Sequence, residues 1–173
     1  GLRDLVISSA LEGTNEAGSV YIVDASQTDV QALSSTAGYI TRITGASSQR
    51  FGSAIVNNGA GLGNDIDADG TEDLVLAGGR GAGLGLYVWY GDTLPTGGAD
   101  VLATTRDYFV TAPASFVNNQ AGGNPLSLRA DWVGDVNGDG LDDICWGDVK
   151  AQGANGTVEE GVFETLFDDG VQP

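Results

Sequence analysis

The sequence predicts an all-β fold, and three features of its composition and patterning point to it. Glycine supplies 28 of the 173 residues and proline only 4, as expected of a folded chain with many turns. Short runs rich in Val, Ile, Tyr, Phe, Trp and Thr are separated by Gly, Asn, Asp and Ser. None of these runs keeps the apolar spacing of a helix over the roughly ten residues that a helix needs. We therefore expect almost only strands.

Ten strands are predicted, each a β-branched or aromatic run between turn-forming residues. In chain order they are 5–9, 19–23, 39–43, 53–56, 74–77, 86–90, 107–111, 127–130, 144–146 and 162–167. The Gly- and Asn-rich segments 57–63 and 118–124 are predicted to be loops between strands.

One acidic pattern occurs twice in full and once in part. The motif Asp-x-Asp/Asn-x-Asp-Gly-x-x-Asp, followed by an apolar run, begins at Asp65 and again 70 residues later at Asp135. The chain opens on residues 1–7, which match the second half of the motif, with Asp4 in the place of Asp73. A fixed period of this length predicts a repeat architecture. We place the repeat units at about 1–50, 51–115 and 116–173.

Each period contains about four predicted strands. Four antiparallel strands per repeat make a blade of a β-propeller, a fold that closes on itself by radial repetition. The 173 residues hold about 2.5 periods, whereas propellers close with about four to eight blades. Residues 1–173 are therefore expected to form part of one larger propeller, with the first acidic loop cut at its start.

The acidic motif has the spacing of a loop wrapped around calcium. Oxygen ligands at alternate positions, a glycine at position 6, a carbonyl at position 7 and a carboxylate at position 9 suit a hard cation with about six to eight oxygen ligands. An EF-hand is excluded, because its twelfth position needs a glutamate and Leu76 and Trp146 stand there. The predicted ligands are Asp65, Asp67, Asp69, the Thr71 carbonyl and Asp73 in the first complete loop; Asp135, Asn137, Asp139, the Leu141 carbonyl and Asp143 in the second; and the Leu2 carbonyl and Asp4 in the truncated copy.

These residues resemble the FG-GAP repeats of integrin alpha-subunit propellers and their bacterial relatives. In that family a Phe-Gly strand precedes a calcium loop, which leads into an apolar strand and an aromatic hairpin strand. Residues 51–54 (Phe-Gly-Ser-Ala), the loop 65–73 and the strands 74–77 and 86–90 follow this order. The Gly-Ala-Pro of the family is degraded here, and the third copy lacks a clear Phe-Gly. The resemblance implies calcium loops on one face of a propeller that rigidify it, with partners bound elsewhere.

Charge and composition exclude several functions. The chain carries 24 acidic and 7 basic residues, a net charge of −17, which argues against nucleic acid as a partner. It has no histidine and one cysteine, so no Ser-His-Asp triad and no Cys/His zinc site can be built. No apolar run approaches the roughly 20 residues of a membrane span. Cys145 aligns with Val75 in the strand after the loop and is expected to be buried.

The sequence thus predicts a calcium-stabilised segment of an exported or cell-surface protein, without enzymatic activity of its own. It would serve as a scaffold for binding, adhesion or assembly, with a protein or a glycan as partner. Two other functions remain open at this stage. The chain could be the propeller portion of a secreted carbohydrate-active enzyme, or a structural subunit that assembles with itself or with neighbouring blades.

Overall fold

The structure, a computed structural model, describes residues 4–26, 40–57, 64–80, 83–113 and 128–148, and the backbone of 162–166. Within these ranges the regular structure is β-strand, apart from the short 3-10 helix η2 (Ala103–Thr105) and a 3-10 residue at Gly83. The predicted all-β class is therefore confirmed. No described helix is long and apolar enough to cross a membrane.

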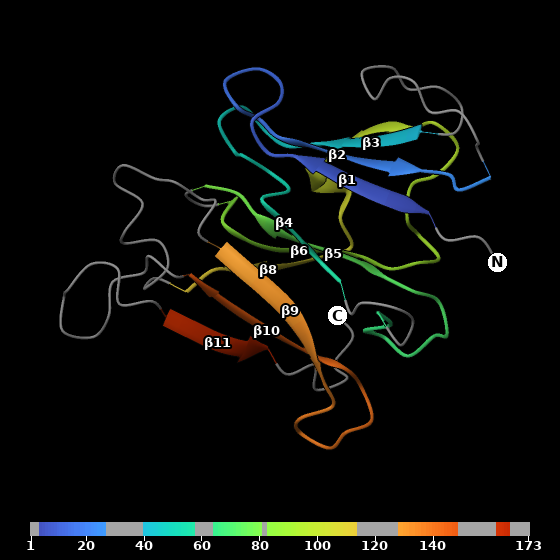
Figure 1. Cartoon of the computed structure of the whole chain (residues 1–173), viewed down its shortest axis with the longest axis vertical. Helices are drawn as coiled ribbons and strands as arrows, with labels where there is room; N and C mark the ends of the chain where they lie inside the picture. The colour runs from blue at the N-terminus through green and yellow to red at the C-terminus, as the bar shows by residue number, and fades with distance from the viewer. Residues whose placement is uncertain are drawn as a thin grey trace.

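The strands form three sheets that stack as layers (Figure 1). In spatial order, the first sheet is β1 (Leu5–Ser9), β2 (Ser19–Val23), β3 (Ile40–Thr44) and β7 (Asp100–Leu102); the second is β4 (Ala54–Val56), β5 (Leu74–Gly78), β6 (Gly85–Trp89) and β8 (Tyr108–Thr111); the third is β11 (Val162–Leu166), β10 (Asp143–Asp148) and β9 (Leu128–Gly134). All pairs are antiparallel except β3 with β7.

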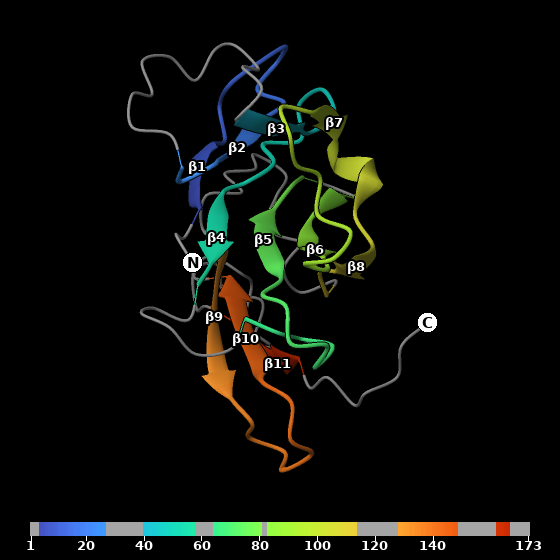
Figure 2. The same ribbon diagram turned by 90° about the vertical axis from the view of Figure 1, so that its right-hand side faces the viewer.

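Every predicted strand overlaps a strand of the structure, and one strand was missed. The second sheet has the four antiparallel strands expected of one repeat unit. The first sheet differs, because β7 comes from the second unit and pairs in parallel with β3 (Figure 2). The predicted strand ends at 39, 127 and 167, and the loop segments 58–63 and 118–124, lie outside the described residues.

Contacts distant in sequence hold β7 in place. The Arg42 amide donates to the Ala99 carbonyl (2.8 Å), and Arg42 Nε donates to Asp100 Oδ1 (3.1 Å). The segment Asp100–Leu102 is only three residues long and mostly exposed, so it lacks the alternating apolar pattern by which a strand is recognised. Its pairing with β3, decided by tertiary contacts, could not be seen in the local sequence.

Each face of β5 packs against a different sheet. Leu74 and Leu76 belong to an apolar cluster between the first and second sheets, together with Val20 and Trp89. Val75, on the opposite face of β5, belongs to a cluster that includes Trp132, Ile144 and Trp146 of the third sheet. Side chains alternate between the two faces of a strand, so an uninterrupted apolar run is what a central strand buried on both faces requires.

Candidate metal centre

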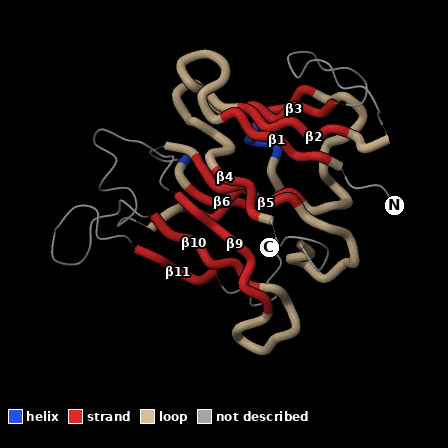
Figure 3. The backbone as a smooth tube through the Cα atoms, in the orientation of Figure 1, coloured by secondary structure: helices blue, strands red, loops and turns tan. Residues whose placement is uncertain are grey.

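Both complete acidic loops lead directly into a central strand. The loop 65–73 precedes β5, and the loop 135–143 joins β9 to β10. Figure 3 shows both loops on the same side of the stacked sheets as the start of β1. An EF-hand loop is flanked by helices, whereas these loops are followed by strands, which agrees with the exclusion of an EF-hand.

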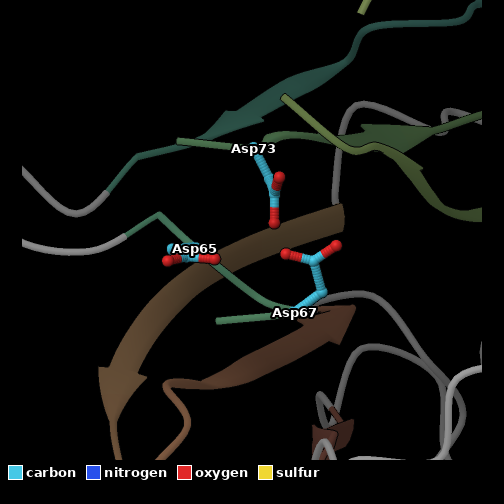
Figure 4. Close-up of side chains that lie close together, drawn as sticks. All are labelled: Asp65, Asp67 and Asp73. Atoms are coloured by element: carbon cyan, nitrogen blue, oxygen red, sulfur yellow. The ribbon is translucent and has the colours of Figure 1, made fainter. Parts of the chain in front are cut away.

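In the first loop three carboxylates converge. One oxygen each of Asp65, Asp67 and Asp73 lies within 4.8 Å of the others, and the three side chains point toward a common space (Figure 4). Asp69 and Thr71, the other predicted ligands, are exposed and stand outside this trio. The Asp69 carboxylate instead accepts the Thr71 amide at 2.6 Å. Amide N–H groups of the loop donate to the carboxylates of Asp65 and Asp69 and so hold these side chains in place.

Asp73, the ninth residue of the motif, joins the two ends of the loop. Its side chain is buried, with 7% of its surface exposed. Oδ2 accepts the Ile66 amide at 2.7 Å, and Oδ1 accepts the Gly91 amide, just beyond β6, at 2.8 Å. The Asp73 amide donates to the Asn64 carbonyl. One carboxylate therefore fixes the start of the loop, its end and the neighbouring hairpin strand.

A tight turn between Asp65 and Gly70 shapes the rest of the first loop. Asp65 accepts the Asp69 amide through Oδ1 (3.1 Å) and the Gly70 amide through Oδ2 (2.9 Å). Gly70 has a φ of 90°, and no atom lies within 4 Å of the place where its Cβ would stand. Glycine is therefore favoured here by the left-handed backbone conformation, not by crowding.

The second loop has the same hydrogen-bond pattern, 70 residues later in the sequence. Position 1 accepts the amides of positions 5 and 6, position 5 accepts the amide of position 7, and position 9 accepts the amide of position 2. The corresponding bonds are Asp139 N to Asp135 Oδ1 (3.1 Å), Gly140 N to Asp135 Oδ2 (3.0 Å), Leu141 N to Asp139 Oδ1 (2.9 Å) and Val136 N to Asp143 Oδ2 (2.8 Å). Gly140 has a φ of 94°, close to that of Gly70.

The second loop differs in how its side chains meet. Asn137 occupies the position of Asp67, and its Nδ2 donates to Asp139 Oδ2 at 2.9 Å. In the part of the chain that the structure describes, the first loop alone brings three acidic side chains together. Asp143 is fully buried, whereas Asp135, Asn137 and Asp139 are exposed and Leu141 is partly exposed. Asn137 Oδ1 accepts the Asp139 amide at 2.8 Å, as Asp67 Oδ1 accepts the Asp69 amide at 3.2 Å, so the atom that could bind a cation has the same contact in both loops.

The partial copy of the motif, in which Asp4 stands in the place of Asp73, keeps one contact of the complete loops. Asp4 is exposed, and its Oδ1 accepts the Ala25 amide at 3.1 Å. Ala25 lies two residues beyond β2, as Gly91 lies two residues beyond β6, so both aspartates bind the same point of their hairpins. Sequence reasoning did not find this contact; the only signal is a small residue two positions after the hairpin strand. Leu2 lies outside the described residues.

Oxygen atoms supply every ligand that these loops can offer, and that donor set suits a hard cation such as Ca²⁺. The close approach of three carboxylates also suits a divalent cation, because its positive charge would offset their mutual repulsion. No family model matches the chain, and no curated protein matches it. The function is therefore argued from the loops and the sheets themselves.

Asp73 should make calcium binding depend on pH. Burial, together with the nearby charges of Asp67 and Asp65, raises the pKa of Asp73 from 3.8 to about 6. Because this pKa is raised, the group stabilises the metal-free fold below its unfolded pKa, and that stability is lost as pH rises through about 6. Calcium needs the carboxylate, so its stabilising effect should grow from about pH 5 to about pH 7.

Thermal melts with and without calcium at the two pH values measure this effect. The variant Asp73→Asn cannot titrate at this position. In this variant, the rise in melting temperature that calcium causes should increase less between about pH 5 and about pH 7 than in the wild type. If the rise caused by calcium increased equally with pH in both proteins, Asp73 would not be the group that makes calcium binding depend on pH.

Proposed function

We propose that this chain is a calcium-binding segment of a β-propeller of the FG-GAP type. The observation that carries the proposal is the hydrogen-bond pattern shared by the loops 65–73 and 135–143, with a buried aspartate at the ninth position of each. An acidic turn that arose by chance has no reason to repeat this pattern, in register, before two central strands.

The residues that would hold the ions follow from the motif. In the first loop they are Asp65, Asp67, Asp69, the Thr71 carbonyl and Asp73; in the second, Asp135, Asn137, Asp139, the Leu141 carbonyl and Asp143. The partial copy of the motif would supply the Leu2 carbonyl and Asp4 to a third site. A bound ion neutralises carboxylates that otherwise repel one another, and it ties the loop to the strand that follows.

The stacking of the sheets supports the propeller. In the second sheet, four antiparallel strands run in the order expected of a blade, and its two faces pack on the first and third sheets. Loops with flexible all-oxygen ligation generally bind calcium at about 10⁻⁴–10⁻³ M in extracellular modules. We therefore place the protein outside the cell or at its surface, as a scaffold for adhesion, binding or assembly with a protein or glycan partner.

Removing one predicted ligand from each loop tests the proposal. Asp69→Ala and Asp139→Ala should each lower the number of bound calcium ions by one and leave the other loop in working order. Both side chains are exposed, so either change should cost the metal-free fold less than about 1 kcal/mol. Isothermal titration calorimetry of the two variants, alone and combined, gives the stoichiometry. Unchanged calcium binding in the double variant would refute the assignment.

A further inference from the structure

The second acidic loop holds an asparagine followed by a glycine, Asn137–Gly138, at positions 3 and 4 of the motif. Both residues are exposed. Gly138 has a φ of 85°, and no atom lies within 4 Å of the place where its Cβ would stand. Because glycine has no side chain to hinder the approach, its backbone nitrogen can reach the side-chain amide of the asparagine before it.

The reaction open to this pair is deamidation through a cyclic imide. The backbone nitrogen of Gly138 attacks Asn137 Cγ, so a bond forms between these atoms and the bond from Cγ to Nδ2 breaks. The Gly138 amide gives up one proton, and Nδ2 takes one up and leaves as ammonia. Water then opens the ring at either carbonyl, which leaves aspartate or isoaspartate at position 137. The reaction is favoured by a base near the glycine amide, a donor to Oδ1 and a partner for the leaving nitrogen.

The hydrogen bonds of the loop supply all three. Asp135 Oδ1 accepts the Gly138 amide at 2.6 Å, so a carboxylate stands where the proton has to be accepted. Asn137 Oδ1 accepts the Asp139 amide at 2.8 Å, which stabilises negative charge on this oxygen during the attack. Asn137 Nδ2 donates to Asp139 Oδ2 at 2.9 Å, so the leaving nitrogen faces a carboxylate that favours its protonated form.

We propose that Asn137–Gly138 is a site of spontaneous deamidation, promoted by the loop that contains it and protected when that loop binds calcium. The oxygens that favour the reaction belong to Asp135, Asn137 and Asp139, which the proposed function assigns to the ion. With an ion bound, these oxygens are ligands and are no longer free to act on the two amides. The protection rests on the proposed function, whereas deamidation of the metal-free loop does not.

The two products have opposite consequences for the loop. Isoaspartate adds a carbon to the main chain between positions 1 and 5, which breaks the ligand spacing and should remove calcium binding from this loop. Aspartate gives the second loop the acidic pattern of the first. The first loop has Asp67 and Ala68 at the same positions, so it cannot undergo this loss of ammonia.

Peptide mapping by mass spectrometry of protein kept in EDTA at neutral pH tests the proposal. Deamidation replaces the NH2 of Asn137 by OH, so it appears as a change of mass in the peptide that contains this residue. The rate at Asn137 in the folded protein should equal or exceed the rate in protein unfolded by urea. In the urea samples, Asn58–Gly59 and Asn155–Gly156 give the rate of the same dipeptide in other sequences. A lower rate in the folded protein, or no change of mass at Asn137, would overturn the proposal.

Variants test the parts that Gly138 and Asp135 play. Gly138→Ala should slow deamidation at least about tenfold, and the loop should tolerate it because Ala68, at the same position of the first loop, has a φ of 58°. Asp135→Asn keeps an acceptor but loses the base, so the rate should also fall at least about tenfold. The control Asp142→Asn removes the same charge from a position of the loop that is not a predicted ligand, and it should leave the rate unchanged. An unchanged rate in Asp135→Asn would contradict promotion by the loop.

Calcium at about 10 mM should slow deamidation of the folded wild type about 10- to 100-fold, because a Kd of about 10⁻⁴–10⁻³ M leaves the loop empty in only that fraction of molecules. Calorimetry of aged protein should show a loss of calcium sites equal to the fraction of isoaspartate. Deamidation in EDTA that calcium does not slow would refute calcium binding by the second loop, and with it the protection. Protein that binds calcium at both loops but keeps Asn137 intact in EDTA would overturn the deamidation site alone.

Discussion

Calcium at about 10 mM should raise the melting temperature of this protein by about 10 °C above its value in EDTA. A ligand that binds only the folded state stabilises it by RT ln(1 + [L]/Kd). With a Kd of about 10⁻⁴–10⁻³ M, each site contributes about 1.4–2.7 kcal/mol at this concentration. For a chain of this size, about 1 kcal/mol corresponds to roughly 2–4 °C, and two filled loops add their effects.

The comparison has to hold ionic strength constant, because salt alone screens a net charge of −17 and stabilises the fold. Differential scanning calorimetry in EDTA, in calcium and in magnesium at matched ionic strength meets this need. Magnesium should give a much smaller shift, since it prefers a rigid octahedron and keeps its water. Equal melting temperatures in calcium and in EDTA would rule out both loops as calcium sites.

Much of the fold could be predicted because its central strands are long apolar runs. β5 and β6 are buried at every position, so burial and β-propensity favour the same structure. The acidic loops could be predicted because their conformation is local. Position 1 accepts the amides four and five residues later, and glycine at position 6 takes the left-handed turn. Side-chain-to-backbone hydrogen bonds between residues so close in the sequence can be recognised from the local sequence.

What could not be predicted depends on contacts distant in sequence. β7 is a strand because its backbone pairs with β3, 58 residues earlier, and the Arg42–Asp100 contact accompanies this pairing. The third sheet's Cys145 is partly exposed because one face of that sheet is open within the described structure, which the alignment with Val75 could not reveal. Similarly, five ligands per loop were predicted, but within the described residues the acidic side chains that converge are Asp65, Asp67 and Asp73. The Asp69 carboxylate instead accepts the Thr71 amide, a local contact that the ligand pattern does not indicate.

Replacing Asp73 with alanine should destabilise the protein even in EDTA, by about 2–4 kcal/mol. The substitution removes the acceptor of two amides, Ile66 N and Gly91 N, and the first of these bonds is buried. It also frees Ile66, whose side chain packs in the cluster that joins the second and third sheets. The loss should appear in urea unfolding of the metal-free protein, and calcium should no longer restore stability through this loop.

The variants Asp69→Ala and Asp73→Asn separate the structural role of Asp73 from ion binding. Asp69→Ala removes a predicted ligand that is exposed, so in EDTA it should be nearly as stable as the wild type. Asp73→Asn keeps one acceptor oxygen for two donors, so its stability should fall between wild type and Asp73→Ala. If Asp73→Ala and Asp69→Ala were equally stable without metal, Asp73 would act only as a ligand. The predicted order of stability in EDTA, with the wild type above Asp73→Asn and Asp73→Asn above Asp73→Ala, instead requires that Asp73 holds the loop in place before an ion binds.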